Sequence, residues 1–547
     1  MFSTLFLVPS HVALWAALCC LLLFAAGHVL YALWFSPYSH IPGPRFCKIS
    51  RLPLALIDLN LQRSAKVHEW HQKYGPVVLI APGEVSFCTP SSTREIYGTA
   101  GRHPKSHYFD HFISYGERAT FNTLDYEKHR QRRKISFAFF QATSIHTPAC
   151  VDPVHSRVVA FLEDIDRHVR ATGSTTVDFF SRVNLYAFDN ITQLIFGSGH
   201  STRTVESPGP ERDMLEGLKH CELWNPLLFN FPLVYHAVKF AVVRLAGKKD
   251  FLSAEDDLTA WSERQVAATL EDDSCYRDHT SLLSRLQQFR DKQGDALPAS
   301  WVKAETLDNL NAAQTTATVA LTYVLYNIAR SPVWQECIRQ ELLALPVGDD
   351  GFPSFHAINS APVLEACVKE SYRLNPLSSG RAERVVPLGK EYDGVFVPKG
   401  TVVSTSTLAI QHDPSAFPQP GLYDPGRWLN AGPDQTRFME MFYIPWGYGA
   451  RVCLGKAFAT LEVKLLVAYL LLRYRISEDA ASPTNADSMM QLGTQDALPK
   501  GLRTTGIHQA ALLDLVICNL TTYGGDEIEL QAGSPVVFVA DGSTAGR

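Results

Sequence analysis

The amino terminus constrains this chain most, because its first 44 residues contain no Asp, Glu, Lys or Arg. The run 12–35 is almost wholly apolar, with Trp15 near one end and Tyr31 and Trp34 near the other. About 20 such residues span a bilayer as a helix, and aromatic side chains favour both membrane interfaces. The run therefore predicts an N-terminal transmembrane helix. A cleaved signal peptide is the alternative, but such peptides begin with basic residues that this chain lacks.

The first charged residues, Arg45, Lys48 and Arg51, come directly after the run. Positive residues next to a membrane span stay in the cytosol, so we expect a single-pass protein with a cytosolic body. Between the span and the body, His40-Ile41-Pro42-Gly43-Pro44 predicts a stiff, non-helical connector, because proline fixes φ and removes an amide donor.

Composition limits what the body can be. With 46% hydrophobic and 19% charged residues, the chain can bury a large core. A net charge of -5 argues against nucleic acid as a partner. The eleven cysteines include no Cys-x-x-Cys pair, which disfavours a zinc or dithiol site. We therefore expect a globular body in a reducing compartment.

The longest element that the sequence predicts in the body is a central helix over 301–330. This segment has no internal Gly or Pro and little charge after Asp308, so we expect it to cross the middle of the molecule. The fold class that follows is mainly α with a smaller β-rich part (α+β). The other predicted elements are amphipathic helices over 334–345 and 361–374 and short strands over 395–397 and 401–406.

Residues 223–246 are rich in aromatic and aliphatic side chains. Pro226 and Pro232 argue against a second membrane-spanning helix. Two interpretations stay open, namely a pair of core helices or an apolar surface close to the bilayer.

The segment Trp446-Gly-Tyr-Gly449-Ala-Arg451-Val-Cys453-Leu-Gly455 carries the strongest chemical signal. Each fixed position has a physical role if a haem lies against it. The Cys453 thiolate is an electron-donating iron ligand, and backbone N–H groups around the sulfur restrain that donation. Gly449 permits the turn that aims the sulfur, and Gly455 lets the backbone approach the porphyrin. Arg451 can neutralise a haem propionate.

This segment resembles the cysteine loop of the cytochrome P-450 family, in which an aromatic residue, usually Phe, opens the motif. Trp446 holds that place here. The resemblance implies a single cytochrome P-450-type domain in which Cys453 is the proximal axial ligand of the haem iron. It divides the chain into an N-terminal membrane anchor (1–36), a proline-rich linker (37–51), the haem domain (52–507) and a C-terminal extension (508–547). Both an added strand pair and a mobile tail are compatible with the extension.

Two further motifs follow from the same resemblance. Glu370-Ser-Tyr-Arg373 is similar to the family's Glu-x-x-Arg helix, and Arg427 is similar to the third member of its ion-paired triad. A carboxylate between two guanidinium groups is held by several charge-assisted bonds, so we expect the triad to support the ligand loop structurally.

Contacts to the haem propionates are also implied. His129 and Arg133 are similar to the family's Trp-x-x-x-Arg pair, with His in place of Trp, and four-residue spacing puts them on one helix face. Arg384 lies where the family places another propionate contact. For Arg130, Arg132 and Lys134 we prefer a solvated basic face or a docking patch for a reductase.

The middle of the long helix, Asn311-Ala312-Ala313-Gln314-Thr315-Thr316, is similar to the oxygen-activation motif of small residue, x, acid, Thr. Ala312 leaves room for dioxygen, and Thr315 is the predicted proton relay. Gln314 stands where the family has Asp or Glu, and an amide hydrogen-bonds without titrating.

The resemblance implies an endoplasmic-reticulum monooxygenase with haem as cofactor and O2 as co-substrate. No fused flavin or dinucleotide motif is present, so electrons from NADPH would come through a separate NADPH-cytochrome P-450 reductase. The chain is most similar in style to fungal members that serve secondary metabolism, which implies an apolar small-molecule substrate. Aromatic residues over 109–121 suggest an apolar pocket with access from lipid.

Two alternatives remain. With Gln314 in the relay position, the protein could catalyse a haem-dependent rearrangement or cyclisation that needs little proton delivery. It could also be a non-catalytic, membrane-tethered haem protein.

Overall fold

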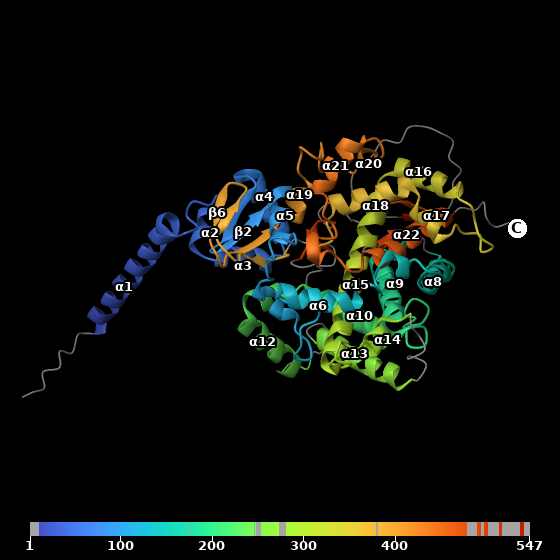
Figure 1. The fold of residues 1–547 in the computed structure, drawn as a ribbon, viewed down its shortest axis with the longest axis horizontal. Coiled ribbons are helices and arrows are strands. Elements are labelled where there is room, and N and C mark those ends of the chain that lie inside the picture. Colours follow the sequence, from blue (N-terminus) through green and yellow to red (C-terminus); the bar gives the residue numbers. More distant parts are fainter. Residues whose placement is uncertain are drawn as a thin grey trace, which may run out of the picture.

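A computed structural model describes residues 10–173, 176–245, 247, 253–272, 280–378, 381–477, 489–493, 497–500, 514–516 and 537–540. These residues form a mainly helical body with small sheets, as the sequence predicts. A single helix projects from the body at the N-terminal end (Figure 1).

That projecting helix is α1 (Ser10–Leu30), which continues into a π-helical turn, η1 (Tyr31–Phe35). Leu14–Phe35 is long and apolar enough to cross a membrane, and no other described helix meets that criterion. Its large side chains are exposed, Phe24 by 75%. Exposed apolar side chains along a whole helix need lipid or another apolar partner to cover them.

The proline-rich connector is non-helical over His40–Pro44, as expected, but it lies against the body. The Pro42 carbonyl accepts the Leu79 amide at 2.7 Å. Ile41 is fully buried in a cluster with Val77 and Leu79. A short helix, α2 (Arg45–Ile49), then begins. The start of the body is therefore attached directly to the end of the anchor.

The β-rich part lies beside the anchor (Figure 1). Its main sheet has the order β1-β2-β7-β4, with β2 and β7 parallel. The strands of the two sheets in this part are β1 (Val77–Ala81), β2 (Glu84–Phe87), β4 (Arg384–Val385), β7 (Val402–Thr405), β5 (Lys390–Tyr392) and β6 (Val395–Val397). Strands from both halves of the chain thus form one sheet.

The centre of the helical part is α15 (Ala299–Ala329), a 31-residue helix. It packs most extensively against α9 (Phe179–Phe196), and also against α18 (Pro362–Leu374) and α22 (Lys456–Arg473). The absence of Gly and Pro lets the helix run unbroken, and its side chains are buried along most of its length. The predicted central helix is therefore confirmed.

The remaining helices surround this centre (Figure 1). In the first half they are α3 (Leu52–Leu59), α4 (Arg63–Tyr74), α5 (Pro90–Tyr97), η2 (His107–Phe112), α6 (Tyr126–Phe137), α7 (Ala142–Ile145), α8 (Pro148–Thr172), α10 (Pro210–Glu222), α13 (Ala254–Glu271) and α14 (Leu282–Gln288). In the second half they are α16 (Pro332–Leu343), α17 (Phe355–Asn359), α19 (Thr407–Gln411), α20 (Gly426–Leu429), α21 (Pro433–Phe442) and η4 (Gly449–Arg451).

Residues 223–246 form two short helices, α11 (Asn225–Asn230) and α12 (Pro232–Phe240), and a π-helical turn, η3 (Ala241–Leu245). Each helix has one of the two prolines in its first turn, where its missing N–H costs nothing. Leu233 is 85% exposed and Leu245 75% exposed. Of the two interpretations, the helix pair is therefore present, but it carries its apolar side chains on the surface.

Two strands lie within the predicted C-terminal extension. β11 (Asp514–Val516) pairs with β3 (Thr176–Asp178), and β12 (Val537–Ala540) pairs with β8 (Tyr474–Ser477). The extension thus supplies strands to a sheet of the body. Gly501 and Leu502, which belong to the family-like ending noted in the sequence, lie outside the described residues; before them β9 (Gln491–Leu492) pairs with β10 (Leu498–Pro499).

Deleting residues 1–36 should move most of the protein from the membrane fraction to the soluble fraction, because α1 is the part of the described chain that can span a bilayer. The measurement is fractionation of cells that express the full-length and truncated chains. Because Leu233 and Leu245 are exposed, a small fraction of the truncated chain should still bind membranes weakly, and high salt should not release it. A truncated chain that stayed with the membranes as completely as the full chain would contradict the assignment.

Candidate functional site

Cys453 lies in a loop that is held at both ends. The Cys453 amide donates to the Trp446 carbonyl at 2.8 Å, which closes the loop. The backbone N–H groups of Gly455 and Lys456 donate to the thiol sulfur. Lys456 is also the first residue of α22, so the sulfur lies at the positive end of an 18-residue helix. These N–H groups stabilise negative charge on the sulfur and so lower the pKa of the thiol, against the effect of burial.

The thiol opens onto an internal space. Cys453 is exposed, yet the surrounding protein raises the pKa of its thiol through burial, against the lowering effects of the Gly455 amide and of Arg133. A side chain that is both exposed and enclosed faces a cavity rather than bulk water. The space beside Gly455 is also open, since an added Cβ there would meet no atom within 4 Å. A flat ligand can therefore reach both the sulfur and the backbone.

Gly449 and Trp446 shape the loop from the other side. Gly449 has φ +71°, and a side chain at this position would strike the Tyr97 carbonyl, so glycine is required here. The Trp446 ring meets the Tyr372 ring edge-on, with 5.5 Å between centroids. Because Tyr372 belongs to α18, this contact joins the ligand loop to that helix.

Five basic side chains gather near this loop: Lys105, His129, Arg133, Arg384 and Arg451. Burial, followed by the positive charges of the other four, lowers the pKa of His129 to about 2. Burial and Arg384 lower the pKa of Arg451 to about 9. Burial and the charges of Arg384 and Arg451 also hold the pKa of Lys105 well below its usual value. Each of these cations lowers the pKa of its neighbours, which means that positive charge is in excess in this cluster.

The cluster fits the two carboxylates of a haem. The Arg451 guanidinium donates to three backbone carbonyls over 123–125, yet its buried Nε has no partner among the described residues. Asp308 is the acid that faces Lys105, but burial raises its pKa to about 8 and leaves it mostly uncharged near pH 7. Anionic ligand groups would therefore be stabilised. The thiol, the open face of Gly455 and this cluster together match a haem.

The middle of α15 presents a partly open stripe. Asp308, Ala312 and Thr316 recur every four residues and are half-buried or exposed, whereas most of the helix is buried. Since the helix runs through the core, this stripe faces an internal space. The Thr316 hydroxyl donates to the Ala312 carbonyl, one turn back, at 2.7 Å. A small residue and a hydroxyl thus lie together on the open side.

Gln314 and Thr315 of the same helix are both buried. The Gln314 amide donates to Asn184 of α9. The Thr315 hydroxyl donates to a carboxylate oxygen of Glu222, the last residue of α10, at 2.9 Å. Of the residues expected at the oxygen-activation motif, Ala312 is therefore exposed and Gln314 is packed against α9, while Thr315 lies under Glu222 at the border of the open face, one turn after the exposed Asn311.

The sequence interpretation missed three residues of this region. Thr316 shares the open face with Ala312, and no pattern in the sequence distinguishes two adjacent threonines. Lys105 joins the cationic cluster from a loop, where no motif marks it. Glu222 comes from a helix 93 residues away in the chain, so no local pattern could have found it.

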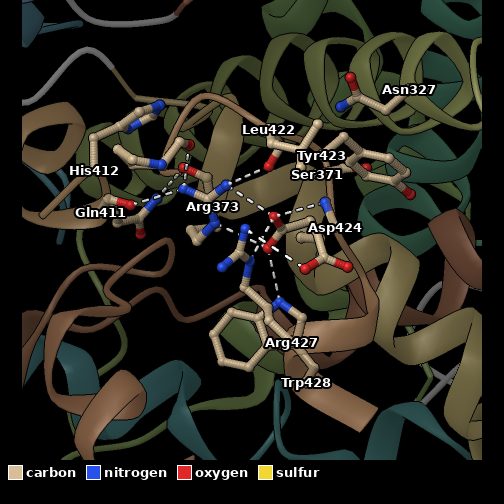
Figure 2. Close-up of polar contacts among 12 residues, drawn as sticks. Asn327, Ser371, Arg373, Gln411, His412, Leu422, Tyr423, Asp424, Arg427 and Trp428 are labelled. Carbon is tan, nitrogen blue, oxygen red and sulfur yellow. Dashed lines mark hydrogen bonds and ion pairs between the residues drawn. The ribbon is translucent and has the colours of Figure 1, made fainter. Parts of the chain in front are cut away.

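Glu370, Arg373 and Arg427 meet in the protein interior behind the ligand loop. Arg373 Nε and its terminal nitrogen donate to both oxygens of Glu370, at 2.9 and 2.8 Å. Arg427 Nε donates to one of them at 3.0 Å. Trp428 Nε1 donates to the other at 2.9 Å, and the Asp424 amide adds a fifth bond at 3.1 Å. Figure 2 shows these donors converging on one carboxylate.

Arg373 also holds the chain that leads to the ligand loop. Its guanidinium donates to the carbonyls of Gln411, Pro420 and Leu422. The Gln411 amide group in turn accepts the Ile444 amide at 3.0 Å, two residues before Trp446. By holding Arg373, the Glu370 carboxylate therefore fixes the backbone at both ends of the irregular segment 412–425. Gln411 and Trp428 were not expected from the sequence.

Comparison with known proteins agrees with this arrangement. A family model described as Cytochrome P450 matches residues 48–500. The chain is 41% identical to the cytochrome P450 monooxygenase FGM1 of Gibberella zeae, over 88% of this chain and 95% of that protein. It is 28% identical to the cytochrome P450 monooxygenase pkfB of Emericella nidulans, over 83% and 89%. A solved structure, cyanobacterial CYP120A1 with bound retinoic acid, shares the fold with a TM-score of 0.66 and 22% identity, over 82% of this chain and 94% of that one.

Replacing Glu370 by Gln should lower the free energy of unfolding by about 3–5 kcal/mol, because two buried guanidinium groups lose their counter-charge. Denaturant titration of the purified protein measures this loss. Glu69→Gln is the control, since the Glu69 side chain is 58% exposed and that of its partner Lys66 is 39% exposed, so that their ion pair is a surface pair worth about 1 kcal/mol or less. Equal losses in the two variants would show that the buried carboxylate has no special role.

Proposed function

The chain belongs to the cytochrome P450 family, and on that premise we propose that it oxidises an apolar small molecule with electrons that reach it from NADPH through a separate reductase. Members of this family are monooxygenases, so the protein is an oxidoreductase with haem as cofactor and O2 as co-substrate. The more specific parts of the proposal concern the site residues, the partner, the substrate and the membrane.

The observation that carries the proposal is the environment of Cys453. Its sulfur receives N–H groups from Gly455 and Lys456 at the start of α22, and it faces an enclosed space. When bound through this thiolate, the haem would supply the activation of dioxygen and the insertion of one of its oxygen atoms into a C–H bond, while the other atom leaves as water. The two N–H groups stabilise negative charge on the sulfur and limit how strongly it donates.

Arg133, Arg384, Arg451 and His129 would hold the propionates, and Lys105 would join them. Burial is the main cause of the lowered pKa of His129 and would persist, but the carboxylates would neutralise the neighbouring positive charges, so haem binding should raise the pKa of the imidazole. His129 would then act as a hydrogen-bond donor in the position that the family gives to Trp.

On the opposite side of the cavity, Ala312 would leave room for dioxygen, and Thr316 would move the proton. We place this role on Thr316 in preference to Thr315 because the Thr316 hydroxyl lies on the open stripe beside Ala312. A hydroxyl bonded to a carbonyl of the preceding turn can turn away and offer its proton to a group in the cavity.

The substrate is proposed to be apolar because a cluster of aromatic rings lies next to Lys105 of the cationic cluster, whose Nζ is 3.6 Å from the Phe109 ring centroid and 3.8 Å from that of Phe121. Phe109, Phe112 and Phe121 contact one another at 5.5–6.2 Å between centroids, and Phe229 of α11 contacts Phe112. The exposed side chains of α12 beyond them, together with α1, suit a bilayer surface. We therefore propose entry of the substrate from the lipid of the endoplasmic reticulum, with residues 1–36 as anchor. The fungal relatives support a role in secondary metabolism.

A rearrangement or cyclisation that uses the same haem is the second candidate. The lack of an acid at position 314 favours it, since such reactions need little proton delivery. Dependence of turnover on NADPH and the reductase separates the two: the oxidation requires both, and an isomerisation requires neither.

Replacing Cys453 by Ala should abolish the ferrous–carbon monoxide absorption that is characteristic of a thiolate ligand, together with NADPH consumption in the presence of reductase. The spectrum of the reduced protein under carbon monoxide is the measurement. Cys337→Ala is the control, since that cysteine is exposed on α16 and far from the loop in sequence. Retention of the thiolate spectrum by the Cys453 variant would refute the ligand assignment.

Replacing Thr316 by Ala should raise the hydrogen peroxide released per NADPH consumed, because reduced oxygen leaves when a proton is not delivered in time. From the usual contribution of a positioned proton donor we expect at least about a tenfold change. Thr322→Ala is the control, because its hydroxyl makes the same kind of bond to a carbonyl one turn back, at 2.7 Å, but is buried in the core. Identical peroxide yields in both variants would remove Thr316 from the relay.

A further inference from the structure

The oxygen-activation motif can also be aligned with Thr316, instead of Thr315, as its threonine. In the pattern small residue, x, acid, Thr, the residues are then Ala313, Gln314, Thr315 and Thr316. The position directly before the relay threonine, where an acid is expected, holds Thr315. A hydroxyl thus replaces the carboxyl group on α15.

A carboxyl group nevertheless reaches this position from another helix. Glu222 ends α10, and one of its oxygens lies 2.9 Å from the Thr315 hydroxyl. Glu222 is half-buried, so it can exchange protons with solvent while it contacts the buried threonine. It also lies at the negative end of the α10 dipole, which disfavours negative charge.

The hydrogen bonds around Thr315 can be made both when Glu222 is protonated and when it is ionised. The hydroxyl has one proton and faces two oxygens, those of Glu222 and of Gln314 at 3.1 Å. With Glu222 protonated, its O–H donates to Thr315, and Thr315 donates to Gln314. With Glu222 ionised, Thr315 donates to the carboxylate, and the amides of Gln314 and Asn184 turn over to keep their bonds. The Thr318 hydroxyl, which also contacts Asn184 Oδ1, keeps its bond to the Gln314 carbonyl when the proton leaves.

We propose that Glu222 is the proton source for the oxygen-binding face of this enzyme and acts through Thr315, in place of the acid that α15 lacks. This inference rests on the proposed function. The Glu222 O–H proton passes to Thr315, whose own hydroxyl proton passes to a water molecule on the open face of α15, which Thr315 borders one turn after the exposed Asn311. Solvent water then returns a proton to Glu222. One proton crosses from solvent to the cavity, only O–H bonds break and form, and nothing is oxidised or reduced in the relay itself.

The proposal makes Glu222 a positioning and proton-supplying residue rather than a haem or substrate contact. It also links the relay to α10, the helix that leads into the apolar α11 and α12.

The first test is infrared spectroscopy of the full-length protein, which needs neither substrate nor turnover. A protonated carboxyl gives a C=O stretching band that shifts in D2O. We expect one such band to be lost in Glu222→Gln and kept in Asp213→Asn, a control at an exposed acid on the same helix. If Glu222→Gln kept every carboxyl C=O band of the unchanged protein, the proposal would be overturned.

The second test is NADPH oxidation by the protein with its reductase, which needs no identified substrate. Glu222→Gln should slow it at least about tenfold and change the solvent deuterium isotope effect, with partial recovery in Glu222→Asp. Thr315→Val should have the same effect, and the double variant should be no slower than either single one. Additive losses, or a rate and isotope effect equal to those of Asp213→Asn, would overturn the inference.

Folding and haem loading are controlled by the ferrous–carbon monoxide spectrum and the thermal midpoint, which should match those of the unchanged protein in all these variants. Thr315→Ser keeps the hydroxyl and should oxidise NADPH at the rate of the unchanged protein. A slow Thr315→Ser variant would mean that lost packing, and not the lost hydroxyl, slows Thr315→Val. If the unchanged protein consumed no NADPH, the proposed oxidation would fail. The infrared band would still decide whether Glu222 holds a proton at Thr315.

Discussion

The carboxylate of Glu370 is the group on which the rest of the site depends. It is fully buried and accepts five bonds, from Arg373, Arg427, Trp428 and the Asp424 amide. An isolated buried carboxylate would be very unfavourable, so each of these donors is held where the charge needs it. Because residues 412–425, between α19 and α20, have no regular secondary structure, side-chain bonds rather than a backbone ladder give them a single conformation.

The two faces of the cavity are built on opposite electrostatic principles. On the Cys453 side, a helix N-terminus and a buried group of cations favour negative charge, both on the sulfur and on the propionates. On the α15 side the nearby acids are neutralised by burial, as the pKa of about 8 for Asp308 shows. Anionic groups are thus attracted to the haem plane and its proximal side, and the distal space stays suited to an uncharged substrate and to O2.

The sequence predicts the fold and the proximal side well, because their signals are local. An uncharged apolar run, a helix without Gly or Pro and the spacing Gly449-x-Arg451-x-Cys453-x-Gly455 are all continuous in the chain. The distal side is harder, because Thr315 and Thr316 differ by only 100° of helical rotation and the packing of α9 and α10 decides which of them faces the cavity. Lys105 and Glu222 depend on tertiary contacts alone.

Placement of an acid on α10 instead of α15 changes what controls proton delivery. An acid on the central helix is held by that helix alone, whereas Glu222 is held by α10, which packs against α9 and α13 and brings its last residue to Thr315. The same helix continues into the exposed apolar segment from which a substrate would enter. The acid that position 314 lacks is then supplied by the helix that leads into the proposed substrate entrance.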